Sequence, residues 1–142
     1  EPVGKIRVRA SRLQATTLSK NQLPFLIDEV PILMVACSFA EGTSVIEDAR
    51  ELRIKETDRI ESMKKGLNQI GGKVEVKGDT IFIEGVGALT GGGEVDSFHD
   101  HRTAMALLVA GLRAAKPFTV KNTDCIQTSY PSFMNHLKKL TG

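Results

Sequence analysis

The fold is decided by one stretch, Glu51-Leu52-Arg53-Ile54-Lys55-Glu56-Thr57-Asp58-Arg59, in which three basic and three acidic residues follow an apolar strand. Beyond it, apolar residues recur at spacings of three, four and three, as on one face of a helix: Ile60, Met63, Leu67 and Ile70. Gly71-Gly72 then predicts the end of that helix. A helix that begins near Glu56 places Glu56 and Arg59 one turn apart, with Lys55 beside them.

Two chemical interpretations of this stretch are open. Two cations and a carboxylate that converge at the start of a helix are able to bind an anion and to transfer a proton. The alternative is a solvated, charged connection, which is what most runs of charge are. The stretch alone does not decide between a binding site and a surface segment.

Length and composition indicate one globular domain. The chain has 142 residues, ordinary apolar and charged fractions, and a formal charge of +2 that is spread along the sequence. Such a charge pattern does not favour nucleic acid as a partner. No apolar run reaches the ~20 residues of a membrane span. The stretch Glu1-Pro2-Val3-Gly4 has no signal-peptide pattern and no initiator methionine, which suggests a piece of a longer chain.

The cysteines indicate a reducing compartment. Cys37 and Cys125 are the only two, and each lies in or beside an apolar run, far from the other. This pattern is typical of reduced, buried thiols in a cytoplasmic protein. Two isolated cysteines and three histidines are too few for a zinc site, so neither a metal nor a cofactor is expected.

The first part of the chain reads as short strands followed by a buried helix. Residues 5–10 alternate apolar and charged side chains, which predicts a half-buried strand, and residues 11–21 predict a second short strand and a loop. Asp28 is the expected N-cap of the next helix, with Pro31 in its first turn. Residues 32–40 are apolar nearly all round, so this helix is expected to be buried on every side.

Strands and turns surround the central stretch. Residues 43–46 read as a strand before it. After its helix, residues 73–77 and 80–84 alternate on either side of Gly78-Asp79, which predicts a hairpin. The glycine-rich residues 85–93 lack the lysine and hydroxyl of a phosphate-binding loop, and a mobile surface loop is expected there.

The last third of the chain contains a second buried helix. Asp100 precedes it, and residues 103–112 are nearly all apolar. Residues 117–120 read as a strand and residues 125–131 as a connection. One face of a final helix is apolar with a histidine: Phe133, His136, Leu137 and Leu140.

The second half repeats the first. Asp28 and Asp100 each open a buried helix that leads to a strand and an amphipathic helix, at an offset of about 70 residues. The repeat predicts an α/β (α+β) domain built of copies of one unit, at about residues 1–84 and 94–142, and each unit has one buried helix, one amphipathic helix and about four strands. Because the apolar helices must be surrounded, we expect helices inside and sheets outside. The equivalent helix starts would face one end of the domain, where anion-binding amides gather.

Three motifs in order resemble a known family. Ile27-Asp28-Glu29-Val30-Pro31, the stretch 51–59, and Asp100-His101-Arg102-Thr103-Ala104-Met105-Ala106 are similar to the enolpyruvylshikimate-phosphate synthase (3-phosphoshikimate 1-carboxyvinyltransferase) family. The resemblance runs from about residue 6 to residue 140. It implies an inside-out α/β barrel in much longer proteins with two domains, each made of three repeated βαβαββ-like units. This chain would be a partial C-terminal domain of two units, with the N-terminal domain absent.

The resemblance implies an enzyme of the shikimate pathway of aromatic amino acid biosynthesis. The family transfers the enolpyruvyl group of phosphoenolpyruvate to shikimate 3-phosphate and releases phosphate, without a cofactor. On this basis Asp28 is the base at the acceptor hydroxyl, and Glu56 takes part in proton transfer at the enolpyruvyl carbon. Lys55 would bind the shikimate substrate. Arg59 and Arg102 would clamp phosphoenolpyruvate, since planar guanidiniums suit carboxylate and phosphate groups.

Three further positions carry weaker expectations. His101 either supports the phosphoenolpyruvate pocket or caps the start of its helix. Thr128 stands where many members have a substrate-binding lysine, as in a divergent subgroup that is often less sensitive to glyphosate. The resemblance therefore implies weaker inhibition by glyphosate. Glu51 stands where many members have asparagine, so no substrate contact is assigned to it.

Two other functions compete with this one. The related enolpyruvyl transferase that acts on UDP-N-acetylglucosamine shares the fold, but not the block from Lys55 to Arg59. A noncatalytic phosphate-binding module would gain nothing from Asp28 and Glu56 near its cations. We expect the full enzyme to be a monomer with small-molecule substrates and no nucleic-acid or membrane partner, and the piece alone to be inactive.

Overall fold

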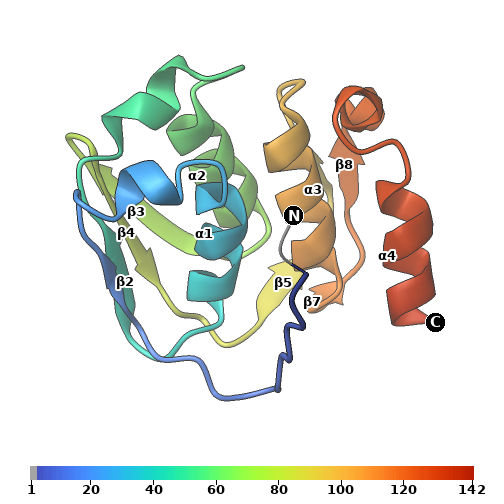
Figure 1. Ribbon diagram of the computed structural model, residues 1–142, viewed down its shortest axis with the longest axis horizontal. Coiled ribbons are helices and arrows are strands. Elements are labelled where there is room, and N and C mark those ends of the chain that lie inside the picture. Colours follow the sequence, from blue (N-terminus) through green and yellow to red (C-terminus); the bar gives the residue numbers. More distant parts are fainter. Residues whose placement is uncertain (1–2) are drawn as a thin grey trace.

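The computed structural model describes residues 3–142 (Figure 1). Its helices are α1 (Val30–Ser38), α2 (Arg59–Gln69), α3 (His101–Gly111) and α4 (Phe133–Thr141), with short 3₁₀ helices η1 (Leu23–Phe25), η2 (Ala49–Ile54) and η3 (Thr123–Thr128). Its strands are β1 (Thr17–Leu18), β2 (Thr43–Ile46), β3 (Lys73–Lys77), β4 (Thr80–Glu84), β5 (Leu89–Gly91), β6 (Glu94–Asp96), β7 (Ala114–Lys116) and β8 (Thr119–Lys121). Among residues 3–142, no helix is both long and apolar enough to cross a membrane.

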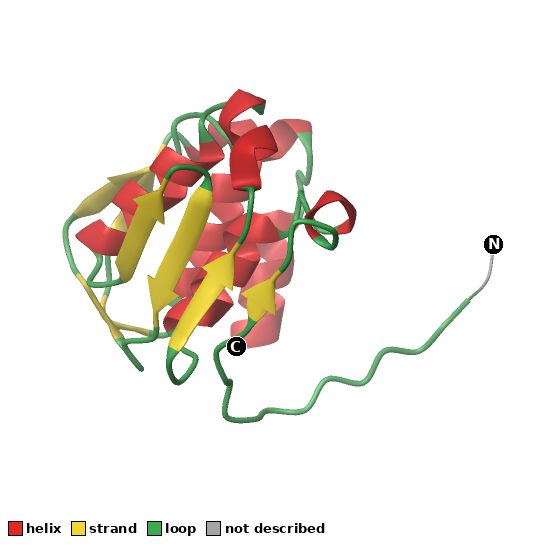
Figure 2. Ribbon diagram, turned by 90° about the vertical axis from the view of Figure 1, so that its left-hand side faces the viewer, coloured by secondary structure: helices red, strands yellow, loops and turns green. Residues whose placement is uncertain are grey.

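Helices α1, α2 and α3 occupy the middle of the molecule with strands around them, whereas α4 lies at its edge (Figure 1). One sheet has the order β1-β2-β4-β3, and the pairs β5-β7 and β6-β8 form two smaller sheets. Figure 2 shows the larger sheet in front of the helices, which cover one of its faces. Helix α3 packs against both α1 and α2 and also against β8. The sheets therefore enclose the helices from outside.

The core forms where the helices meet the sheet. In β4 the side chains alternate, so that Ile81 and Ile83 are fully buried and Phe82 between them is not. The helices contribute further large, fully buried apolar side chains to this core: Met34, Ile60, Met63, Leu67 and Leu107. The spacing predicted for the α2 face is confirmed, because Ile60, Met63 and Leu67 all point into the core.

The predicted hairpin and the strand before the central stretch are confirmed. Strands β3 and β4 pair antiparallel with Val74 opposite Ile83, and Gly78 in their turn has a φ of +61°. Strand β2 pairs antiparallel with β4 on its other side. This three-strand core of the sheet supports η2 and α2.

Helix α2 begins later than predicted. Its N-cap is Asp58, whose carboxylate accepts a hydrogen bond from the Glu61 amide at 3.1 Å, so Glu56 lies before the helix. The residues before it are also not a strand, since residues 49–54 form η2. The predicted end is confirmed, because the Gly72 amide bonds to the carbonyl of Leu67 at 2.8 Å.

The glycine-rich residues 85–93 are not the mobile loop that their composition predicted. They contain β5, which pairs with β7, and Leu89 is fully buried. A Cβ on Gly85 would overlap the carbonyl oxygen of Ala40, so the chain passes there with its backbone against another backbone. Gly91 likewise lies against the carbonyl of Lys116, so two glycines of this segment serve close packing, whereas Gly87, Gly92 and Gly93 have positive φ angles in open space.

Residues 5–10 do not form the predicted strand. Ile6 is 94% exposed and Val8 is 87% exposed, and the segment runs away from the molecule (Figure 2). An alternating pattern produces a strand only beside another strand, and residues 3–142 supply none at this place. Pairing starts with the bridge from Gln14 to Glu41 and continues in β1, which is the short strand expected in residues 11–21.

The two buried helices differ at their starts. Asp100 is the N-cap of α3 as predicted, but α1 has Glu29 at the N-cap position, not Asp28. Pro31 stands in the first turn of α1, as expected. Ile32 is 39% exposed, so α1 is not buried on every side.

The same order of elements occurs twice. The parallel pairs β1-β2 and β6-β8 each lead to a left-handed residue, Asp48 with a φ of 52° and Asn122 with a φ of 58°. A 3₁₀ helix follows in both cases, η2 or η3, and then a helix, α2 or α4. The copies differ in burial, because α2 lies in the core whereas α4 has no fully buried residue.

Candidate functional site

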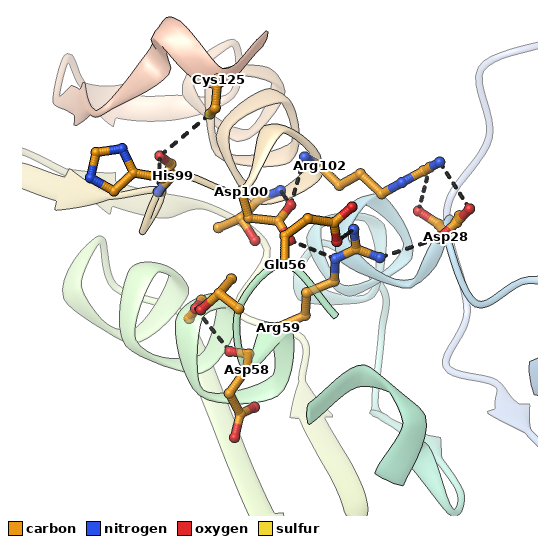
Figure 3. Close-up of polar contacts among 12 residues, drawn as sticks. Asp28, Glu56, Asp58, Arg59, His99, Asp100, Arg102 and Cys125 are labelled. Atoms are coloured by element: carbon orange, nitrogen blue, oxygen red, sulfur yellow. Dashed lines mark hydrogen bonds and ion pairs between the residues drawn. The ribbon is translucent and has the colours of Figure 1, made fainter. Parts of the chain in front are cut away.

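One buried guanidinium holds three carboxylates together. Arg59, at the start of α2, is 1% exposed. Its Nε donates to Asp100 Oδ2 at 2.7 Å and its Nη1 to Asp28 Oδ1 at 3.2 Å, while its Nη2 contacts Glu56 (Figure 3). These acids precede α1, α2 and α3, so Arg59 ties the starts of three helices to one point. The predicted contact between Glu56 and Arg59 is present, although Glu56 lies outside the helix.

A second arginine completes the cluster on its solvent side. Arg102 Nη2 donates to Asp28 Oδ2 at 2.9 Å, and its Nη1 donates to the backbone carbonyl of Asp28 at 3.0 Å. The side chains of Arg102, Asp28 and Glu56 are 31%, 44% and 49% exposed. Solvent thus reaches these three groups, with Arg59 behind them. We call Asp28, Glu56, Arg59, Asp100 and Arg102 the arginine cluster.

Asp100 is the member of the arginine cluster that was not predicted as a site residue. It is completely buried, and besides Arg59 it accepts the amides of Arg102 at 2.8 Å and Thr103 at 3.1 Å. The guanidinium, two amides and the positive end of α3 together compensate a charge that burial alone would not allow. The sequence identified Asp100 as a helix start, and its acidic side chain beside Arg102 was the available signal.

Formal charges in the arginine cluster do not favour anions strongly. Two guanidiniums face three carboxylates, so the cluster has no surplus of positive charge. An anionic ligand must therefore displace Asp28 or Glu56 from an arginine, or bring further cations with it. Because both acids are partly exposed, they are the groups that are able to move.

The other predicted site residues lie around the arginine cluster and not in it. Lys55 and Glu51 are exposed, and within residues 3–142 neither has a hydrogen bond or ion pair to the cluster. His101 is the half-buried first residue of α3. Thr128 is exposed at the end of η3, where its hydroxyl donates to the Cys125 carbonyl at 2.7 Å. The structure thus brings Asp28, Glu56, Arg59 and Arg102 together and leaves these four apart.

A groove opens beside the arginine cluster. Its volume is about 250 Å³, with Asp28 and Arg102 at its charged end. The remaining walls are mostly apolar and come from α1, α3 and the start of α4; they include Ile32, Met105, Val109 and Phe133. A small ligand with one anionic end fits the chemistry of this lining.

The loop before Asp100 has an unusual backbone. Phe98 and His99 have positive φ angles of 53° and 61°, which side-chain-bearing residues seldom adopt. Asp96 holds the loop by accepting the Asn122 amide group at 2.8 Å and the Phe98 amide at 2.7 Å. The pKa of the Asp96 carboxyl is lowered, mainly by the hydrogen bond from Asn122 and next by that from the Phe98 amide. The loop thereby fixes the direction in which Asp100 enters the cluster.

The two cysteines are free, as their sequence context predicted. Cys125 is half-buried near the loop, and its Sγ donates to the Asn122 carbonyl at 3.1 Å. Burial raises the pKa of the Cys125 thiol. Within residues 3–142, no group of histidine, cysteine and acidic side chains has an arrangement that would hold a metal ion.

Comparisons with known proteins agree on one family. The family model described as EPSP synthase (3-phosphoshikimate 1-carboxyvinyltransferase) matches residues 1–137. The chain is 48% identical over 140 residues to the 3-phosphoshikimate 1-carboxyvinyltransferase of Geobacter sulfurreducens. The alignment covers 99% of this chain and 32% of that protein. The enzyme of the same name from Synechococcus sp. (strain JA-3-3Ab) is 46% identical, and the alignment covers 99% of this chain and 31% of that enzyme. The chain therefore spans about a third of the length of these curated relatives.

Solved structures give the same result for the fold. EPSP synthase from Acinetobacter baumannii superposes with a TM-score of 0.86 at 40% identity, over 90% of this chain and 30% of that one. The enolpyruvyl transferase NikO from Streptomyces tendae has a TM-score of 0.74 over 93% of this chain and 29% of its own, but at 21% identity it supports the fold alone. The predicted α/β fold, with helices inside and sheets outside, is confirmed. On the family match and these relatives, the chain belongs to the EPSP synthase family.

Proposed function

We propose that the chain is part of a longer enzyme that transfers the enolpyruvyl group of phosphoenolpyruvate to shikimate 3-phosphate and releases phosphate. The observation that carries the proposal is the arginine cluster, in which Asp28 and Glu56 contact two arginines and whose Asp28 and Arg102 form the charged end of a groove. Family membership supports the reaction, and the length of the relatives supports a larger protein. In this proposal residues 1–84 and 94–142 are two units of the C-terminal domain, and an N-terminal domain supplies the rest of the site.

Arg102 and Arg59 are proposed to bind phosphoenolpyruvate in sequence. Arg102 is partly exposed and meets the anion first through its planar, bidentate edge. Arg59 is buried and occupied by three carboxylates, so it binds only after Glu56 or Asp28 has moved away. Binding of phosphoenolpyruvate would thus release the two carboxylates that the chemistry requires.

Asp28 and Glu56 are proposed to handle the protons. As the acceptor oxygen bonds to the enolpyruvyl carbon, its proton passes to Asp28, and a proton from Glu56 adds to the methylene carbon. A double bond is restored when the new methyl group returns a proton to Glu56 and the carbon–oxygen bond to phosphate breaks, and the departing phosphate takes up the proton held by Asp28. The arginines stabilise the negative charge on the departing phosphate. Both carboxylates are about half exposed, which supports access by a substrate.

Three residues outside the arginine cluster have proposed supporting roles. Lys55 binds shikimate 3-phosphate from its exposed position, and His101 supports the pocket from the start of α3. Thr128 offers a hydroxyl and no cation at its place in η3. We therefore retain the proposal of weaker glyphosate inhibition than in relatives with a lysine there.

The competing functions fit the site less well. A noncatalytic phosphate-binding module is disfavoured by Asp28 and Glu56, which occupy the arginines and weaken their attraction for anions. For the UDP-N-acetylglucosamine enzyme, the similarity to NikO adds no support beyond the fold. A cytoplasmic monomer without nucleic-acid partners is proposed, supported by the two free cysteines and the small net charge.

Titration of this chain with phosphoenolpyruvate should reveal the anion site. We expect amide NMR shifts to appear first at Arg102 and Arg59, with weak affinity on the order of 1 mM, because solvent screens the half-open site. Arg102→Ala should abolish the shifts. Arg113→Ala is the matched control, since Arg113 lies over the Phe39 ring, away from the cluster. Saturable shifts that persist in the Arg102→Ala variant would contradict the proposed clamp.

The isolated chain is expected not to turn over. Without the second domain the cluster stays open to water, and the closure that strengthens its contacts with substrate does not occur. A phosphate-release assay with phosphoenolpyruvate and shikimate 3-phosphate should show no rate above the background without protein. Measurable release would show that one domain suffices, against the two-domain proposal.

A further inference from the structure

The segment that carries Lys55 and Glu56 has little packing of its own. It connects η2 to α2, and Ile54, Lys55 and Glu56 are all exposed, with Ile54 at 82%. Glu56 contacts Arg59, and the hydroxyls of Thr57 and Ser62 lie 3.2 Å apart, but Lys55 has no hydrogen bond or ion pair of its own within residues 3–142. The position of Lys55 therefore depends on how the two ends of the segment are held. We call residues 54–57 the site loop.

Arg53 makes polar contacts at the base of the site loop. Its Nη1 donates to Asp58 Oδ2 at 3.0 Å, its Nε to Asp79 Oδ1 at 3.0 Å, and its Nη2 to the Gly78 carbonyl at 2.8 Å. Because Arg53 lies in the last turn of η2 and Asp58 caps α2, their ion pair joins the two ends of the site loop. The bond to Asp79 is the main cause that raises the pKa of the Arg53 guanidinium.

The hairpin turn on the other side of Arg53 is a fixed part of the fold. Strands β3 and β4 enclose Gly78-Asp79, and β4 lies between two antiparallel neighbours. The Asp79 carbonyl also accepts the amide of Ala49, the first residue of η2, at 2.7 Å. The turn therefore holds η2 at its start through Ala49 and near its end through Arg53.

We propose that Arg53 is a positioning residue, which closes the site loop against the hairpin turn and so sets where Lys55 and Glu56 stand. Arg53 does not touch the arginine cluster; it acts through Asp58 and the loop. The roles of Lys55 and Glu56 rest on the proposed function, but the effect of Arg53 on the position of the site loop does not. A guanidinium is required because its three acceptors lie in different directions, whereas a lysine ammonium satisfies one or two of them.

The proposal is tested on this chain by ¹⁵N relaxation. In Arg53→Met, which retains much of the length of the side chain, the order parameter of Lys55 should fall from about 0.85 to below about 0.6, and those of Glu56 and Thr57 should fall less, because Arg59 and Ser62 still contact them. Arg53→Lys should restore only part of the loss. Asn68→Ala is the matched control: Asn68 ties α2 to the same hairpin through the amide and carbonyl of Val74, at 2.7 and 2.9 Å, but far from the site loop. It should leave the loop rigid.

The outcomes separate this proposal from a purely structural role and from the proposed function. A loss of stability in both variants, with a rigid site loop in Arg53→Met, would overturn it. If Arg53→Met does not fold, Asp79→Asn removes one charged acceptor and should loosen the same residues to a smaller extent. In the longer enzyme, Arg53→Met should lower kcat about 100-fold with a smaller effect on KM, as for a misplaced group. An inactive longer enzyme with the NMR result intact would reject the proposed function and not the role of Arg53.

Discussion

Replacing Arg59 with methionine is expected to lower the free energy of unfolding by about 3–5 kcal/mol, the cost of breaking one side of a buried ion pair. The loss arises mainly at Asp100, which is completely buried and would keep its charge without a cation. Asp28 and Glu56 contribute less, because both are partly exposed and regain water when the guanidinium is gone.

Urea denaturation followed by circular dichroism measures this loss of stability. Two further variants test its cause and provide a control. Arg59→Met/Asp100→Asn removes the stranded charge and should recover about 1–3 kcal/mol of the loss. Lys73→Met removes the exposed pair with Glu84, at 2.6 Å, and should change stability by no more than about 0.5 kcal/mol. A double variant less stable than Arg59→Met would show that the buried charge is not the cause.

Gly85→Ala is expected to destabilise the chain by about 3 kcal/mol, at the upper end for overpacking. The new Cβ would overlap the Ala40 carbonyl oxygen and lie 2.7 Å from its carbon, and neither is the end of a flexible side chain. The backbone cannot withdraw easily, because the Gly85 amide bonds to the Gly42 carbonyl and the Val86 amide to the Ser38 carbonyl, each at 2.9 Å. Thermal and urea unfolding both report the change.

Gly111→Ala is the control for this prediction. Gly111 is the last residue of α3, and a Cβ there meets the Phe118 ring at an ordinary 3.6 Å. Alanine has the higher helix propensity, so the variant should be neutral or more stable by up to about 1 kcal/mol. Equal losses in the Gly85 and Gly111 variants would mean that close backbone packing is not what Gly85 provides.

Contacts between residues close in sequence were predictable, and distant ones were not. The hairpin at Gly78-Asp79 and the pair Glu56–Arg59 follow from local spacing and are present. The bond from Arg59 to Asp100 spans 41 residues, and periodicity carries no information on such a distance. The repeat indicated only that equivalent helix starts share one end of the domain. It did not show that one arginine would hold all three acids.

Two wrong predictions have physical reasons that composition does not reveal. The alternating residues 5–10 have the pattern of a strand, but a pattern supplies no neighbour to pair with. Glycines suit both a mobile loop and close contact between backbones, and only the position of Ala40 against Gly85 distinguishes these uses. Helix α2 starts at Arg59 and not near Glu56 as predicted, because the Asp58 side chain caps it. The sequence did not show which of several nearby acidic residues would be the cap.

The arginine cluster also has an order of assembly. Synthesis proceeds from the N-terminus, so Asp28, Glu56 and Arg59 leave the ribosome well before Asp100 and Arg102. Until α3 follows, Arg59 has two partly exposed partners, and the start of α1 lacks the arginine that holds the Asp28 carbonyl. The contacts at the helix starts of the first copy are therefore incomplete until the second copy is present. The site is complete only when α3 is in place, because the bond between Asp28 and Arg102 joins residues that are 74 positions apart, and closing so long a loop costs conformational entropy.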